Sequence, residues 1–342
     1  MADAIIAKAK AIYGHHLTAA DYNNLMHRKS VGGVVAFLKE NERYRKLFSD
    51  TNETQVHRGQ VEQMLSKEVF ELYLRLCRFM LAEKDSFCYF LIKEREIKEI
   101  ISALVYVASE LPDGYVKVMP AYFMDYASFD LMALANAKSL DDILNALSQT
   151  HYYKLLKPLL SGKSDEEPDL EECGMTLYVD YINWAFAAIE RGFKGDEEKE
   201  LKENFLKQID LDNILTCYRM KISFESDSAK VKKSLKPFHY RINEQRFDEI
   251  LSGSDAGKKL IEMINRYYFK NNIEIDSDFL EVAIRRFNYS YYSRQFAFAT
   301  SGITALYSFM VLLEVERTNL LKIIEGIRYG LEPAEIEKLV VY

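Results

Sequence analysis

Three segments of the sequence place a carboxylate three residues before a second polar side chain and four residues before an aliphatic one. The pairs are Glu96 with Glu99, Asp210 with Asn213, and Glu316 with Asn319. Residues three apart on a helix share a face, so each carboxylate can act together with its polar neighbour. Such a pair could bind a ligand or serve catalysis, or it could form hydrogen bonds that close a contact between helices. Its recurrence favours the structural interpretation.

Other stretches match catalytic or binding motifs only in part. GSDAGKKL (Gly253 to Leu260) approaches a phosphate-binding loop, but its glycines are one residue too close and Lys259 stands where Ser or Thr must bind magnesium. Asp141 and Asp142 resemble part of an aspartate-rich metal motif. Ser139 precedes them as a helix N-cap, however, and the helix dipole favours acids in a first turn. The histidines include no i, i+4 pair that could chelate a metal. We therefore expect no catalytic residue, no cofactor, no nucleotide site and no metal site.

The elements that position the third polar pair are predicted clearly in ERTNLLKIIEGIRYGLEPAEIEKLVV (Glu316 to Val341). Apolar residues recur at helical spacing from Leu320 to Ile327. Gly330 stands where a left-handed C-terminal cap is needed, and Leu331 can fold back onto the apolar stripe. Pro333 suits the first position of a second helix. The stretch predicts a helix, a glycine stop and a short helix.

Composition indicates an all-α protein. The chain has 342 residues with only 14 Gly and 6 Pro, about half their average share, and strand-rich proteins need more turn residues. The longest apolar runs are too short to span a bilayer, and the N-terminus lacks a secretory signal. The net charge of −7 argues against a nucleic-acid partner. Four scattered cysteines indicate free buried thiols, and the single tryptophan, Trp184, is expected in the core.

A capped helix pair recurs three times along the chain. The turn position holds Ser30, Ser139 and Asp255, an N-cap residue in each copy. Matching apolar and aromatic positions flank the turns: Leu25, Leu134 and Ile250; Leu38, Leu147 and Met263; Tyr44, Tyr153 and Phe269. Each copy continues into long helical segments that carry one polar pair. We divide the chain into helical repeats at 1–113, 114–235 and 236–342, which could close into a ring or stack as an open solenoid.

Essentially the whole chain resembles the C subunit, called d in eukaryotes, of V-type and A-type rotary ATPases. The most specific part is E-x-x-N-L-x-x-I-x-x-G-x-x-x-G-L-x-x-x-x-I, met here by Glu316, Asn319, Leu320, Ile323, Gly326, Gly330, Leu331 and Ile336. The turns at Ser30 and Ser139 and the stretch DLDNIL with Asp210 and Asn213 support it. Gly32 and Gly33 depart from the pattern, and so does the capped turn of the third repeat.

The resemblance implies a funnel of three similar helical domains with no active site. Such a protein lies in the central stalk of an ion-translocating ATPase or ATP synthase, on the cytoplasmic side of the membrane. There it couples the central shaft to the membrane rotor ring, without a transmembrane segment of its own. Two other classes stay open from the residues alone. One is a free-standing helical-repeat adaptor, and the other is an all-helical enzyme with a buried polar cluster.

Overall fold

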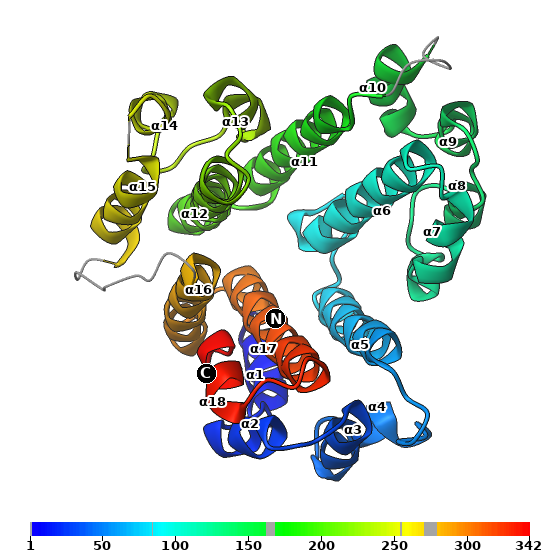
Figure 1. Ribbon diagram of the computed structural model, residues 1–342, viewed down its shortest axis with the longest axis vertical. Helices are drawn as coiled ribbons and strands as arrows, with labels where there is room; N and C mark the ends of the chain where they lie inside the picture. The colour runs from blue at the N-terminus through cyan, green and yellow to red at the C-terminus, as the bar shows by residue number, and fades with distance from the viewer. Residues whose placement is uncertain (1, 84, 162–167, 254, 270–278) are drawn as a thin grey trace. The chain divides into compact units, whose positions relative to one another are not determined.

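The computed structural model describes residues 2–83, 85–161, 168–253, 255–269 and 279–342. Eighteen α-helices and no β-strand form within these ranges, so the predicted all-α fold is confirmed (Figure 1). The helices fall into two compact units. Unit 1 comprises residues 1–82 and 255–342, and unit 2 comprises residues 83–254. The division of the sequence into three repeats stays a prediction.

Unit 1 joins the beginning of the chain to its end. Its helices are α1 (Ala2–Tyr13), α2 (Ala19–Met26), α3 (Val31–Glu40), α4 (Arg45–Phe48), α5 (Arg58–Phe79), α15 (Ala256–Ile264), α16 (Leu280–Ala297), α17 (Gly302–Arg328) and α18 (Pro333–Leu339). α17 packs against α1, α2, α3, α5, α16 and α18. Because 19 of its 27 residues are buried, α17 is the axis around which unit 1 is built.

The predicted apolar stripe of α17 forms part of the core of unit 1. Leu320, Ile323 and Ile324 are fully buried in one cluster with side chains from α2, α3, α5 and α18. Burial of each such side chain contributes roughly 1.5–3 kcal/mol. This cluster therefore fixes the first helices of the chain onto the last long one.

The end of α17 adopts the predicted glycine cap. Gly330 has φ +69°, its N–H donates to the carbonyl of Ile327 at 3.2 Å, and the Leu331 N–H donates to the carbonyl of Gly326 at 2.9 Å. These two bonds define a Schellman motif, and Leu331 packs against the core cluster. α18 then begins at Pro333, as predicted. A Cβ on Gly326 would lie 2.6 Å from Ile336 of α18, so this glycine permits the close approach of the two helices.

Replacing Gly330 with alanine is expected to lower the free energy of unfolding by about 1 kcal/mol, because a Cβ is strained at this positive φ. Gly59 in α5 provides a control in the same unit. Its φ is ordinary, and a Cβ there would meet the His57 ring at 3.5 Å, a normal contact distance. Urea denaturation of Gly330→Ala and Gly59→Ala compares the two sites. Equal stabilities would contradict the glycine-cap assignment.

Unit 2 is built on three long helices. Its helices are α6 (Phe90–Ala108), α7 (Pro112–Val118), α8 (Leu131–Ala135), α9 (Leu140–Ala146), α10 (His151–Leu160), α11 (Leu170–Gly192), α12 (Asp196–Tyr218), α13 (Ser228–Ser234) and α14 (Glu244–Leu251). α6 packs against α7, α8, α9 and α11, while α11 also packs against α10 and α12. A π-helical turn, Arg219–Ser223, extends α12.

The three predicted turn residues all act as helix N-caps. The side-chain oxygens of Ser30, Ser139 and Asp255 accept backbone N–H groups at the starts of α3, α9 and α15. Asp142 completes a capping box with Ser139 through a 3.0 Å bond from the Ser139 N–H. The acids beside Ser139 therefore serve the helix terminus.

Each predicted long segment is broken into two helices, α5 with α6, α11 with α12, and α16 with α17. Leu81 with φ +53° and Gly195 with φ +64° lie in two of the breaks. The expectation that Trp184 lies in the core is wrong. Its side chain is half-buried on α11 and lines a pocket. Helical periodicity places Trp184 beside apolar neighbours on α11, but it cannot show that a pocket lies in front of that face.

Candidate functional site

The first residue of each polar pair is a carboxylate buried on one of the long helices α6, α12 and α17. Their relative exposures are 1% for Glu96, 0% for Asp210 and 5% for Glu316. A buried carboxylate is costly unless hydrogen bonds or a counter-charge compensate it. Their partners therefore determine what these positions can do.

Glu316 binds residues from the beginning of the chain. Its Oε2 accepts the backbone N–H of Leu17 at 2.9 Å, and its Oε1 accepts the hydroxyl of Tyr44 at 2.5 Å. Nη1 of Arg43 lies 2.7 Å from Oε1, and both charged side chains are almost fully buried. Burial and the adjacent carboxylate raise the pKa of Tyr44 well above its usual value, so Tyr44 stays a neutral donor.

Asn319, one turn further along α17, holds the end of the chain. Its amide nitrogen donates to the carbonyl of Val341 at 2.5 Å, and its amide oxygen accepts the Val341 N–H at 3.0 Å. The side-chain amide thus pairs with a backbone peptide in both directions. Glu316 and Asn319 together fix both ends of the chain to the middle of α17.

Asp210 and Asn213 make a similar arrangement in unit 2. Asp210 accepts three backbone N–H groups, from Tyr240 at 3.0 Å, Arg241 at 2.8 Å and Ile242 at 3.1 Å. Asn213 donates to the Lys236 carbonyl at 3.0 Å and accepts the Lys236 N–H at 2.9 Å. The amide again pairs with one peptide in both directions.

Glu96 on α6 binds a backbone N–H from a distant segment, as Asp210 and Glu316 do. It accepts the Ser128 N–H at 2.6 Å and the hydroxyl of Tyr152 at 2.7 Å, with Nζ of Lys93 at 3.4 Å. Burial and the charge of Glu96 raise the pKa of Tyr152, which keeps this hydroxyl protonated.

Glu99 replaces the asparagine of the other two pairs. It accepts the hydroxyl of Tyr115 at 2.6 Å and pairs with Arg95 at 2.6 Å. The equivalent backbone position, two residues beyond the short helix α7, is Pro120. Because proline has no N–H, an asparagine here could not form the two-way peptide pair, and Glu99 uses a tyrosine instead.

Each of the three acids accepts a backbone N–H from the segment just before a capped helix. The N–H groups of Leu17, Ser128 and Ile242 lie one or two residues before the N-caps of α2, α8 and α14. We call each acid with its bound segment a clamp. The clamps of α6 and α12 hold the segment that follows them in the sequence, whereas the clamp of α17 holds the start of the chain.

A seven-residue helix follows each clamp helix, and of these three short helices the sequence predicted only α18. α7, α13 and α18 each begin 16 to 18 residues after the acid. In two cases the polar partner of the acid bonds to the residue two positions beyond the short helix. The predicted repeat boundary after residue 113 falls inside α7. Because α7 follows α6 as α13 and α18 follow their own clamp helices, we group α7 with α6.

One correspondence in the predicted repeats is wrong by a single residue. The sequence pattern aligns Tyr44 with Tyr153, but Tyr152 makes the bond to the acid that Tyr44 makes. Tyr152 is buried and Tyr153 only half-buried. The sequence pattern fits either of the two adjacent tyrosines. Only the direction of each side chain in the folded chain distinguishes them.

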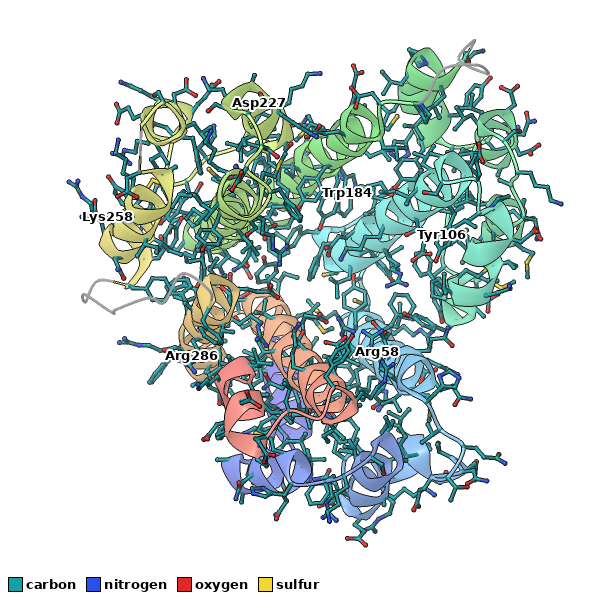
Figure 2. All side chains as sticks on the ribbon, viewed as in Figure 1. Arg58, Tyr106, Trp184, Asp227, Lys258 and Arg286 are labelled. Atoms are coloured by element: carbon teal, nitrogen blue, oxygen red, sulfur yellow. The ribbon has the colours of Figure 1, made fainter. Side chains whose placement is uncertain are left out.

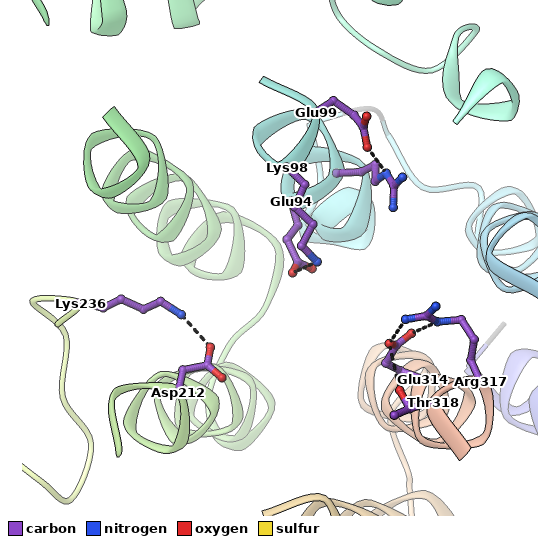
Figure 3. Close-up of polar contacts among 9 residues, drawn as sticks. Glu94, Lys98, Glu99, Asp212, Lys236, Glu314, Arg317 and Thr318 are labelled. Carbon is purple, nitrogen blue, oxygen red and sulfur yellow. Dashed lines mark hydrogen bonds and ion pairs between the residues drawn. The ribbon is translucent and has the colours of Figure 1, made fainter. Parts of the chain in front are cut away.

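The helix faces opposite the clamps carry partly exposed ion pairs. Figure 3 shows Glu94 with Lys98, Asp212 with Lys236, and Glu314 with Arg317, at 2.6, 2.7 and 2.5 Å. Glu94, Asp212 and Glu314 lie two residues from an acid, on the far side of the same helix. Burial alone would raise the pKa of Glu94, but the ammonium of Lys98 holds it below its usual value.

The remaining predicted site residues lie apart from the acids. Gly326, Gly330 and Leu331 form the end of α17, and Ser30 and Ser139 cap their own helices. The sequence does not identify Arg43, because only the folded chain brings it beside Glu316.

The clamps are arranged to hold backbone segments in place. Each acid has both oxygens engaged by backbone or side-chain donors. Within the described ranges, no group of three or more His, Cys, Asp or Glu side chains could hold a metal ion. Among the same residues, no helix is both long and apolar enough to cross a membrane.

Comparison with known proteins places the chain among components of ATP synthases. A model of the ATP synthase (C/AC39) subunit family matches residues 5–339. The C subunit of the A-type ATP synthase from Thermococcus onnurineus is 24% identical over 343 residues, covering 98% of this chain and 88% of that protein. The protein of the same name from a Desulfurococcus species is 24% identical, covering 97% and 88%. That of Thermococcus gammatolerans is 21% identical, covering 98% and 88%.

Proposed function

The chain belongs to the ATP synthase (C/AC39) subunit family, and on this premise we propose that it couples a central shaft to a membrane rotor ring in a rotary ATPase. In this role it has no catalytic residue of its own. It forms a socket, peripheral to the membrane, whose three similar helical parts surround the shaft. The work of the protein is mechanical, and ion movement and ATP chemistry belong to its partners.

The observation that carries the proposal is the extent of the family match. It spans residues 5–339, which include all three clamps and the capped helices that they hold. The matched proteins are named as C subunits of A-type ATP synthases, and the alignments of all three described above cover nearly the whole chain. A match confined to one helix pair would have supported only a shared fold element.

The clamps suit a part that transmits torque. Exposed ion pairs contribute about 0–1 kcal/mol each, so none of them could carry a mechanical load alone. Buried carboxylates that accept several N–H groups, such as Asp210, resist local opening more strongly. Repeating this device three times distributes the load over the chain.

The charged faces opposite the clamps are our candidates for contact with the shaft. The acids Glu94, Asp212 and Glu314 lie on the long helices α6, α12 and α17, and their ion pairs leave these side chains partly exposed. Charged groups on such a face can orient a partner and exclude wrong ones.

Omission of this chain from the assembled complex tests the proposal. We expect ATP hydrolysis without ion transport, because the shaft would turn without moving the ring. Addition of the full chain should restore transport. Full transport in its absence would contradict the coupling role and favour a free-standing adaptor.

A further inference from the structure

Unit 2 contains a pocket that the clamps do not use. It has a volume of about 270 Å³ and lies between α6, α10 and α11. Its lining includes Lys93, His151, Asp180, Tyr181 and Trp184. Figure 2 shows Trp184 between α11 and α6. The pocket is smaller than the roughly 300–1,000 Å³ of sites for drug-sized ligands, so it suits a single side chain better than a nucleotide.

The walls of the pocket are aromatic. Trp184 and Tyr181 lie nearly parallel, with ring centroids 6.2 Å apart and planes 20° apart. Tyr181 is buried, whereas Trp184 is half-buried and available to a ligand. The face of tryptophan is the best aromatic surface for a cation. These rings therefore favour a flat, positively charged group.

The charges around the pocket also favour a cation. Asp180 lies on α11 with its side chain 34% exposed, and its Oδ2 is 3.0 Å from Nε2 of His151. Asp85 adds a second carboxylate at the rim. The cation of the pocket, Lys93, lies 3.4 Å from Glu96, so its charge is directed toward the clamp. Two carboxylates, Asp85 and Asp180, thus line the pocket together with one lysine, whose ammonium is paired with Glu96.

We propose that this pocket binds an arginine side chain of a partner polypeptide. A guanidinium can stack on Trp184 and donate two N–H groups to one carboxylate, which an ammonium cannot do in the same plane. Asp180 is the acceptor and Trp184 the stacking surface. The assignment does not depend on the coupling role, because the isolated chain contains every residue of the pocket.

Titration of the full chain with N-acetyl-arginine amide tests this site. Because the chain has a single tryptophan, its fluorescence reports on Trp184 alone. We expect a saturable change in Trp184 fluorescence at millimolar concentrations, the range of a single side-chain contact. Lysine amide should bind more weakly. The neutral isostere citrulline amide should leave the fluorescence unchanged. An equal response to citrulline, or no binding by either fluorescence or calorimetry, would overturn the proposal.

Two substitutions separate the site from a nonspecific effect of charge. Asp180→Asn keeps the shape of the side chain and should weaken arginine binding about tenfold, the loss expected for one charge-assisted contact. Glu190→Gln removes an acid on the same helix, 59% exposed and outside the pocket, and it should leave the affinity unchanged. Equal weakening by both variants, or none by Asp180→Asn, would show that the pocket does not recognise the guanidinium.

Discussion

Replacing Glu316 with glutamine is expected to lower the free energy of unfolding of unit 1 by about 3–5 kcal/mol, because Arg43 would be left buried without its counter-charge. The change also weakens the bonds from Leu17 and Tyr44, which attach the start of the chain to α17. Urea denaturation measures the loss. Hydrogen exchange should show it first around α2 to α4.

Two further variants make this result specific to the clamp. Glu314→Gln removes an acid two residues away on the same helix, where the carboxylate is 53% exposed, and should cost less than about 0.5 kcal/mol. Adding Arg43→Met to Glu316→Gln should recover part of the loss, since no lone buried charge remains. If Glu316→Gln were no more destabilising than Glu314→Gln, the clamp would not hold the two ends together.

Replacing Asp210 with alanine is expected to cost about 2–4 kcal/mol, because three backbone N–H groups lose a charged acceptor at once. The loss should be local. Amide exchange should accelerate from about residue 236 to the first turn of α14, while the clamp of Glu96 keeps its protection.

Asp212→Ala is the matched control for Asp210→Ala. It lies two residues along α12, is 49% exposed and pairs with the side chain of Lys236. Loss of such an exposed pair is expected to change stability by less than about 1 kcal/mol. Similar exchange profiles in the two variants would mean that Asp210 does not organise the segment before α14.

Local features of the fold could be predicted where neighbouring residues decide the outcome. Ser139 with Asp142 defines a capping box within four residues, and Gly330 with Pro333 defines a stop and a start. These motifs depend on backbone geometry that neighbours in the sequence impose. The same locality explains why the polar pairs were found, since residues three apart share a helix face.

Features that depend on distant segments could not be predicted. Glu316 lies 299 residues from Leu17, and nothing in the local sequence identifies that partner. The choice between Tyr152 and Tyr153 depends on which side chain turns toward Glu96. Trp184 follows the apolar pattern of α11, yet a pocket in front of it leaves the ring accessible.

The proline at position 120 explains a difference between the polar pairs that only the folded chain makes clear. The first polar pair has Glu99 at the position where the other two pairs have an asparagine. The structure shows that the backbone partner has lost its N–H there, so the asparagine pairing is impossible and Tyr115 takes its place. Pro120 and Glu99, 21 residues apart in the sequence, are thus compatible with each other where an asparagine at position 99 would have no N–H to accept.

The proposed coupling role is tested most directly by the number of ions transported per ATP hydrolysed, measured in membrane vesicles that carry the complex with or without this chain. We predict that this ratio falls to zero without the chain while hydrolysis continues, and that added full chain restores it. An unchanged ratio in vesicles that lack the chain would contradict the account.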